Sequence, residues 1–396
     1  MKQGHLFSTL GKGFLYLGLM AFVFVLAICC SSSIGHNTAS KAELPKKKDS
    51  FTEVNLLFAG DVMMHLPEIN AARVDSADGF DFSPFFQYIA PIVKKADIAV
   101  ANLETTFGGK PYKGYPQFSA PDTLAWFLKR AGFNLMVTAN NHAADRGEHG
   151  VIGTIDGLNR AGLVHTGTFK DSADRAKTFP YMIEKKGIRF AFLNYTYGTN
   201  GLKVPPPAII NYIDTTQIKL DIAMAHTLKA DAIIVVFHWG IEYQRMPNEE
   251  QKQLARFCLE QGIDVVIGSH PHVVQPAFWQ AFRKKGDTVD RKGLVLYSLG
   301  NYVSAQRDRY KDGAIMFSFT VKKNKFTKAI SIEKPNFEPT WVYVRPKSYT
   351  ILPANIFEAD TNFVRLPAER EQMMQSYKDN RAHMMRDSIP WLQEMK

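Results

Sequence analysis

Six short apolar runs in this sequence are each followed by polar side chains that can bind a metal ion or form hydrogen bonds. These side chains belong to Asp61, Glu104, Asn141, His142, His238, His270, His272 and Asn301. Carboxylates, amides and imidazoles together form a mixed oxygen and nitrogen ligand set, which suits Mn, Zn, Fe or Co better than Ca. Two divalent ions beside Asp61 and Glu104 would keep excess positive charge, attract phosphate or carboxylate anions and make a nearby water molecule more acidic.

Each of these residues also has an ordinary structural explanation. Asp61 is compatible with a helix N-cap, Glu104 with a charge at the rim of a sheet, and His238 with a histidine satisfied in the core. The segment ANNHAADRG is compatible with a turn, because Asn and Asp favour turns. The joint position of these residues after apolar runs favours a shared site. Three further histidines lack such a position, and we assign no role to His149, His165 and His226.

The segment GSHPHV places two histidines on either side of one proline, directly after the apolar run Val265–Ile267. Proline disfavours helix and pushes the residue before it toward extended backbone. In extended backbone, residues two apart point to the same side, so we expect His270 and His272 to face one site together. Gly268 is expected to let the chain turn away from the end of the strand.

The apolar runs predict strands that are covered on both faces, because they are continuous rather than alternating. They span Val54–Ala59, Ile98–Ala101, Leu135–Ala139, Ile233–Phe237, Val265–Ile267 and Leu294–Leu296. Segments with helical spacing lie between them, at residues 121–132, 150–162, 215–230 and 248–262. This alternation predicts an α/β fold, in which sites form at the carboxyl ends of the strands. A hairpin around Lys186-Gly187 and strands within 314–323 and 339–346 are also expected.

The N-terminal part differs from the rest of the 396-residue chain. Residues 1–34 contain an uncharged stretch long enough to cross a bilayer, so we expect a cleaved signal peptide, a lipoprotein signal or a membrane anchor. Residues 35–53 are polar and indicate a linker, and each alternative places the body outside the cytoplasm. If Cys29 and Cys30 stay with the leader, Cys258 is alone, and its helical surroundings favour a buried, inert thiol.

The net charge of +10 suits an anionic polymer, a phosphate compound or a lipid surface, although ordinary solvated lysines also explain it. The sequence contains no RNA- or DNA-binding motif that we recognise, so no nucleic-acid partner is expected. With 45% hydrophobic and 22% charged residues, the chain has the composition of a folded protein with a large core.

Seven motifs, from Val54 to Val344, resemble the CapA family of poly-γ-glutamate capsule biosynthesis proteins. They read GDVMMH, ANLET, ANNHAADRG, FHWGIEY, GSHPHVVQ, YSLGN and PTWVYV. The family is similar to the calcineurin-like metallophosphoesterases. The resemblance therefore implies a four-layer α/β/β/α sandwich over residues 54–345, with two metal ions at the strand ends and a helical C-terminal extension over 346–396.

By position, the resemblance implies a role for each polar residue. The implied metal ligands are Asp61, Glu104, Asn141, His238, His270 and His272, with the last two on different ions. His142 corresponds to the general acid or transition-state stabiliser. Residues that support the ligands or contact substrate are His65, Asn102, Asp145, Glu242 and Asn301. Met63 departs from the pattern, because phosphoesterases of this type usually have His two residues after the first Asp; His65 is a candidate replacement.

Three hypotheses about function follow. The first is a metal-dependent hydrolase that cleaves a phosphoester or a γ-glutamyl amide. The second is a non-catalytic accessory factor that binds an anionic polymer within a membrane-bound synthesis or export complex, which Met63, the apolar N-terminal stretch and the basic body favour. The third is a structural envelope protein, which the joint strand-end positions disfavour.

Overall fold

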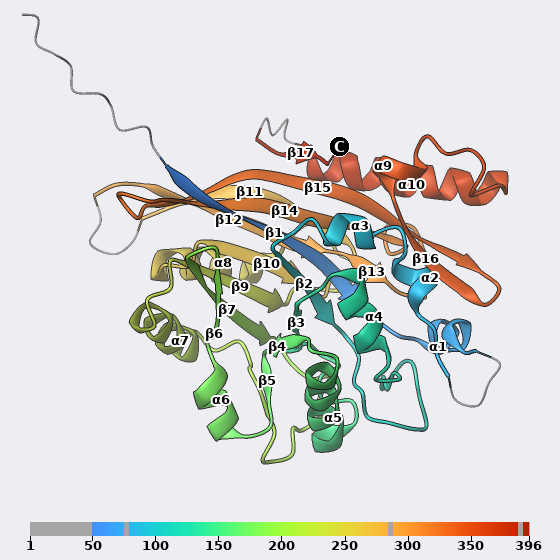
Figure 1. Cartoon of the computed structure of the whole chain (residues 1–396), viewed down its shortest axis with the longest axis horizontal. Helices are drawn as coiled ribbons and strands as arrows, with labels where there is room; N and C mark the ends of the chain where they lie inside the picture. The colour runs from blue at the N-terminus through green and yellow to red at the C-terminus, as the bar shows by residue number, and fades with distance from the viewer. Residues whose placement is uncertain (1–49, 75–78, 284–287, 387–390, 396) are drawn as a thin grey trace, which may run out of the picture. The chain divides into compact units, whose positions relative to one another are not determined.

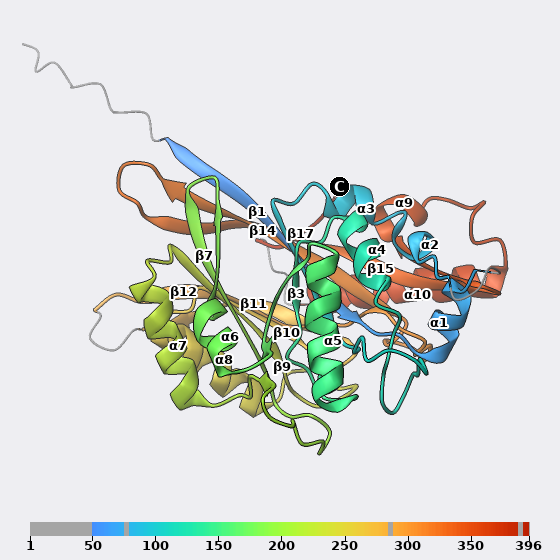
Figure 2. The same cartoon turned by 60° about the horizontal axis from the view of Figure 1, so that its bottom comes forward.

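Two β-sheets form the centre of the structure, a computed structural model that describes residues 50–74, 79–283, 288–386 and 391–395 (Figures 1 and 2). In the described residues, the larger sheet has nine strands in the order β16-β15-β14-β1-β2-β3-β4, with β13 beside β1 and β17 beside β15. These strands are β1 (Phe51–Val62), β2 (Ile98–Leu103), β3 (Leu135–Val137), β4 (Val164–Thr166), β13 (Asn301–Val303), β14 (Gly313–Asn324), β15 (Ile330–Arg345), β16 (Ser348–Pro353) and β17 (Gln393–Glu394).

The smaller sheet has six described strands in the order β11-β12-β10-β9-β7-β6. Its strands are β6 (Tyr181–Lys185), β7 (Ile188–Thr196), β9 (Ala232–His238), β10 (Val265–Ser269), β11 (Val274–Phe282) and β12 (Arg291–Leu299). A separate short pair joins β5 (Thr168–Phe169) to β8 (Ile209–Ile210).

Helices cover the outer faces of both sheets. The described helices are α1 (Leu66–Ala72), α2 (Ser83–Phe86), α3 (Ala90–Val93), α4 (Leu124–Ala131), α5 (Gly147–Arg160), α6 (Ser172–Thr178), α7 (Thr215–Thr227), α8 (Glu249–Gln261), α9 (Ala354–Phe357) and α10 (Pro367–Met384). Helix α8 shows how local sequence sets the bounds. Asn248 and Gln251 form a reciprocal capping box at its start, and Gly262 ends it with a φ of 110°.

The alternation of side chains along β1 explains the layered order. Leu56 and Phe58 pack into the core between the two sheets, whereas Leu57 faces the core beneath α1 to α4. A third core lies between the smaller sheet and helices α7 and α8, where Cys258 is fully buried. The predicted four-layer α/β/β/α sandwich with a C-terminal helical segment is confirmed by these cores and by α10.

Strand directions bring the polar strand ends together. β1, β2, β3 and β4 run parallel, as do β7, β9, β10 and β12. Asp61 pairs in register with Asn102 of β2 and with Asn301 of β13. The carboxyl ends of the parallel strands of both sheets therefore meet at one edge of the sandwich.

The expected hairpin at Lys186-Gly187 is confirmed by the antiparallel pairing of β6 with β7. The chain does not become helical directly after residue 345, because β16 first adds a strand to the larger sheet beside β15. The expectations for residues 1–34, and most of the linker expected over 35–53, lie outside the described residues. Within the described part of the chain, no helix combines the length and apolarity that a membrane crossing requires.

Candidate metal centre

Two buried carboxylates lie at the end of the larger sheet. Asp61 comes from the end of β1, and Glu104 directly follows β2. Both are fully buried. Asn102, between them in space, donates from Nδ2 to Asp61 Oδ1 at 2.9 Å and reaches Glu104 Oε2 at 3.4 Å. The second oxygen of Glu104, Oε1, is buried and accepts no hydrogen bond.

The smaller sheet contributes His238, the last residue of β9. Its Nε2 lies 2.8 Å from Asn141 Oδ1 and 3.5 Å from Glu104 Oε1. Its Nδ1 lies 3.2 Å from the hydroxyl of Ser269 and 3.3 Å from Asn102 Nδ2. Imidazole, amide and carboxylate groups from three separate chain segments thus converge at one point.

The backbone of the GSHPHV segment differs from the expected extended form. His270 has a φ of 97° and His272 a φ of 59°, so both lie in the left-handed region that non-glycine residues rarely adopt. The two imidazoles still face one site, with ring centroids 5.8 Å apart. Strained backbone of this kind persists only where surrounding contacts enforce it, and it is concentrated at functional sites.

The expected role of Gly268 was also wrong. It lies inside β10 and has no positive φ. A Cβ at this position would lie 1.9 Å from the carbonyl oxygen of Tyr297 and 2.4 Å from Trp239 Nε1. Gly268 therefore allows β10 to approach β12 closely, and the turn away from the strand begins at His270.

His272 connects the carboxylates to the rim of the site. Its Nδ1 lies 3.0 Å from Asn301 Oδ1 and 3.4 Å from Asp61 Oδ2. Its Nε2 lies 3.9 Å from both Glu104 Oε1 and Glu242 Oε1. Glu242 is 43% exposed, so its carboxylate reaches the centre from the solvent side.

His142 and Asp145 form a pair beside the centre. Nδ1 of His142 lies 2.8 Å from Asp145 Oδ2, which also accepts from the backbone N–H of Phe118 at 2.6 Å. His65 lies elsewhere: its ring contacts the edge of Phe118, whose ring in turn contacts His142. Its Nδ1 lies 3.4 Å from buried Glu68. Among the described residues, His65 belongs to none of the clusters with metal-ligand spacing.

Electrostatics at the centre favour a bound cation. Burial raises the pKa of Glu104 well above its usual value, and the negative charge of Asp61 raises it further. Burial and the neighbouring imidazole of His270 hold the pKa of His238 well below its usual value. Burial, with His272 adding to it, lowers the pKa of His270 to about 3. Neutral imidazoles are the form that binds metals, and a cation would favour ionised Glu104.

The donor set fits metal ions. In the part of the chain that the structure describes, three overlapping groups have ligand atoms within 4.8 Å of one another. They are Glu104 with His238 and His270, Asp61 with Glu104 and His272, and Glu242 with His270 and His272. Glu104 is shared by the first two groups, and its Oε1 has no hydrogen bond. His270 Nδ1 is likewise buried without a partner. Buried polar atoms without partners are rare, and a cation would satisfy both.

Tyr197 is a residue at this site that the sequence reasoning missed. Its ring centroid lies 4.6 Å from that of His270 and 6.3 Å from that of His238. Burial, followed by the negative charge of Glu242, raises the pKa of Tyr197 to about 12, so its hydroxyl remains a hydrogen-bond donor. It directly follows β7, and the same strand-end rule that found the other residues could have found it.

Known proteins are similar to this chain over most of its body. The family model for the bacterial capsule synthesis protein PGA_cap matches residues 55–306. The chain belongs to this family. It is 30% identical over 299 residues to the PGA biosynthesis protein CapA of Bacillus subtilis (strain 168), covering 72% of this chain and 73% of that protein. It is 29% identical over 293 residues to the capsule biosynthesis protein CapA of Bacillus anthracis, covering 70% and 66%.

Solved structures similar to this family member are more distant in sequence. They include the NAD nucleotidase NadN of Haemophilus influenzae, at 13% identity and a TM-score of 0.47, covering 87% of this chain and 57% of that chain. They also include the calcineurin-like phosphoesterase YfkN of Bacillus subtilis, at 13% identity and a TM-score of 0.41, covering 84% and 98%.

Proposed function

We propose that this family member is a metal-dependent hydrolase of capsule polymer metabolism, acting on a phosphoester or a γ-glutamyl amide. One observation supports the proposal most directly. Six potential ligands from five strand ends meet in a buried cluster whose shared carboxylate has an oxygen without a hydrogen bond. The six are Asp61, Glu104, Asn141, His238, His270 and His272, and they suit two ions of Mn, Zn, Fe or Co. When bound, such ions supply Lewis acidity and a more acidic water molecule.

The side chains around the ligands have distinct tasks in this proposal. Asp145 accepts a hydrogen bond from Nδ1–H of His142 and so orients the ring, and the doubly protonated imidazole can then give its Nε2 proton to a leaving group. Asn102 and Asn301 orient Asp61 and His272 through hydrogen bonds. Tyr197 and Glu242 are exposed beside the ligands, where a substrate would contact them.

The location and partners of the protein belong to the same proposal. The apolar run within residues 1–34 would hold the body outside the cytoplasm at the membrane, either as an anchor or as a lipoprotein. The substrate would be an anionic polymer or a phosphoester, reached within a membrane-bound polymer synthesis complex. Membership of the capsule synthesis family supports this assignment.

A non-catalytic role in binding an anionic polymer is the second candidate, and Met63 favours it. The Met63 side chain is buried and offers a thioether where the related phosphoesterases usually have an imidazole. A thioether is a weak ligand for Mn or Zn, so the ion beside Asp61 would be held with fewer strong donors.

The decisive experiment combines elemental analysis with hydrolysis assays on the full chain loaded with Mn or Zn. Generic phosphomonoesters, phosphodiesters and γ-glutamyl peptides serve as substrates. The hydrolase proposal expects stoichiometric metal and turnover of at least one class. His270→Ala is expected to lose metal, whereas His149→Asn, a histidine outside the centre, is expected to leave both metal and turnover unchanged.

The outcomes separate the two candidates. A protein without stoichiometric metal contradicts the metal centre itself. A metal-loaded protein that hydrolyses none of these substrates, but binds polyglutamate in a manner lost in His270→Ala, supports the accessory role instead.

A further inference from the structure

The end of the sandwich opposite the metal centre is formed by the starts of strands from both sheets. Lys186, in the turn between β6 and β7, donates to Asp97, which precedes β2, at 2.7 Å. Lys323, near the end of β14, donates to the carbonyl oxygen of Gly187 at 3.2 Å and to Asp231 at 2.6 Å. Strand β1 also begins at this end, at Phe51 (Figure 1).

Lysines gather at this end from segments that are far apart in the sequence. We call them the basic face, which comprises Lys94, Lys95, Lys185, Lys186, Lys322, Lys323, Lys325, Lys328 and Lys334. Three of them are neutralised locally, because Lys186 and Lys323 pair with aspartates and Lys322 lies near Glu53 and Glu333. Among the described residues, no carboxylate forms an ion pair with Lys94, Lys95, Lys325, Lys328 or Lys334, all of which are exposed.

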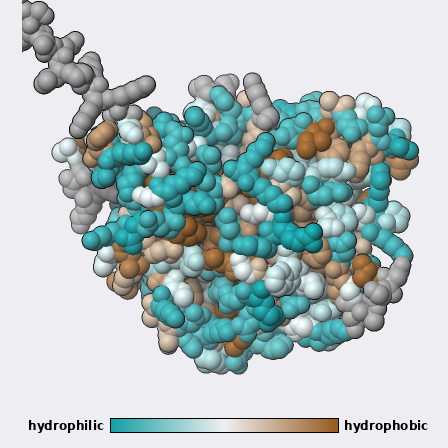
Figure 3. All heavy atoms as spheres, viewed as in Figure 1, coloured by the Kyte–Doolittle hydropathy of each residue, from teal (hydrophilic) through white to brown (hydrophobic). Residues whose placement is uncertain are grey.

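Aromatic side chains are exposed among these lysines. Phe326 lies in the turn between β14 and β15 and is 52% exposed, with Lys325 and Lys328 beside it. Phe51 is 41% exposed, and Lys322 Nζ lies 4.8 Å from the centre of its ring. Figure 3 shows hydrophilic and hydrophobic residues side by side at this end of the body. Lysines that surround an exposed aromatic ring are typical of segments that lie in a lipid headgroup layer.

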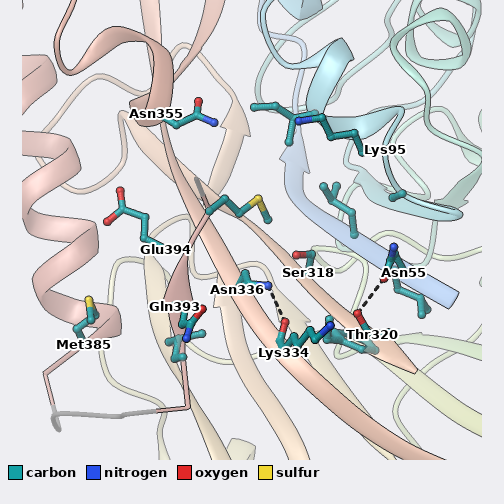
Figure 4. A pocket seen from close by; sticks show the side chains of 17 residues that line it. Asn55, Lys95, Ser318, Thr320, Lys334, Asn336, Asn355, Met385, Gln393 and Glu394 are labelled. Atoms are coloured by element: carbon teal, nitrogen blue, oxygen red, sulfur yellow. Dashed lines mark hydrogen bonds between the residues drawn. The ribbon is translucent and has the colours of Figure 1, made fainter. Parts of the chain in front are cut away.

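A groove adds polar groups next to the basic face (Figure 4). It has a volume of about 950 Å³ and is lined by Lys95 and Lys334, together with Asn55, Ser318 and Asn336. The carboxylate of Glu394 also lines it and is paired with Arg381. It lies at the start of β1, whereas Asp61 is at the other end of that strand, so it is separate from the metal centre. Ammonium, amide and hydroxyl groups in one groove can hydrogen-bond to the phosphate of a lipid headgroup.

We propose that the basic face docks on the surface of a bilayer that contains anionic phospholipid. Each lysine near such a surface contributes about 1 kcal/mol of attraction, which is about fivefold in the docking equilibrium. Aromatic rings at the turn favour a membrane over an anionic polymer, because a polyglutamate chain offers no apolar layer for them to enter. Docking would hold the metal centre at the end of the body that faces away from the membrane. With a rise of about 3.3 Å per residue along β1, the centre would lie roughly 30 Å from the lipid.

The test uses the full chain incubated with nanodiscs of phosphatidylcholine alone or with phosphatidylglycerol added. Hydrogen exchange of the amides in residues 322–334 reports docking of the body, independently of any insertion by the N-terminal segment. Anionic discs are expected to slow this exchange, and high salt is expected to restore it. The variant K325E/K328E is expected to weaken docking by about 25-fold or more. The control K113E/K203E makes the same charge change at the metal end and is expected to dock normally.

Two results would overturn the proposal. One is that the amides of residues 322–334 exchange hydrogen equally fast on neutral and on anionic discs. Equal exchange in the wild type and in K325E/K328E on anionic discs would count in the same way. The other is full protection by soluble polyglutamate without lipid, which would assign the face to polymer binding. Neither result depends on turnover. The membrane-docking proposal can therefore fail while the proposed hydrolase activity holds, and the reverse is also possible.

Discussion

Replacing Glu104 by glutamine should change stability in opposite directions with and without metal. Glu104 is fully buried next to Asp61, and its Oε1 accepts no hydrogen bond. Burial and the charge of Asp61 raise the pKa of Glu104 well above its usual value. In chelated protein, the folded state therefore disfavours the ionised form of this carboxyl group more than the unfolded state does.

The sign and size of the effect without metal follow from proton linkage. A carboxyl group with a raised pKa contributes stability that is complete below its ordinary pKa and is lost as the pH rises through the folded-state pKa. Glutamine has nearly the shape of the protonated acid but cannot ionise. At pH 8 in a chelator, we expect Glu104→Gln to be more stable than the wild type, by about 1.4 kcal/mol for each pH unit between the ordinary pKa and the folded-state pKa of the carboxyl group, up to pH 8.

With metal the order should reverse. An ion that binds only the folded state at 100 times its Kd stabilises it by about 2.7 kcal/mol, and every tenfold loss of affinity removes about 1.4 kcal/mol of this gain. Because Glu104 belongs to two of the three ligand groups, its neutral replacement weakens both. We therefore expect the wild type to gain more stability than Glu104→Gln when Mn or Zn is added.

Urea and thermal unfolding of the wild type and of Glu104→Gln are measured at pH 5 and at pH 8, each with EDTA or with excess Mn. This gives four conditions for each protein. Glu249→Gln, a change at an exposed surface glutamate, controls for the amide substitution itself. The reasoning is refuted if Glu104→Gln is less stable than the wild type in EDTA at pH 8 while gaining equal stability from Mn.

Three other perturbations have defined outcomes. His142→Asn should keep the bound metal, measured by elemental analysis, and lower turnover by about 10² to 10⁴; Asp145→Asn should also shift the pH–rate profile. Gly268→Ala should destabilise the fold by more than about 3 kcal/mol in urea unfolding, because a Cβ there would lie 1.9 Å from a backbone oxygen. A Cβ at Gly198 would have no atom within 4 Å, so the control Gly198→Ala should not cause this loss of stability. Burial raises the pKa of Glu338 to about 7 from 4.5, so about 3 kcal/mol of stability should be lost as the pH rises through that interval. Unfolding midpoints of Glu338→Gln should lack this loss.

The amino-acid sequence by itself indicated the layers of the fold and the composition of the candidate site. Continuous apolar runs alternating with helical patterns are sufficient to predict parallel strands covered on both faces. The carboxyl ends of such strands meet, so Asp61, Glu104 and His238 could be grouped without coordinates. The ligand chemistry followed from side-chain types alone, since carboxylates and imidazoles keep their donor atoms in any conformation.

Only the tertiary structure decided how those groups meet. Pattern arguments assume regular backbone, so they could not find the left-handed conformations of His270 and His272, which depend on contacts made by distant segments. Likewise, the packing role of Gly268 and the contact of Tyr197 with His270 depend on how closely neighbouring strands approach. The lysines of the basic face are scattered along the chain, and only the folding of several strands and turns brings their charges to one end. Side-chain types are local properties, whereas distances between residues far apart in sequence are set by packing of the whole sandwich.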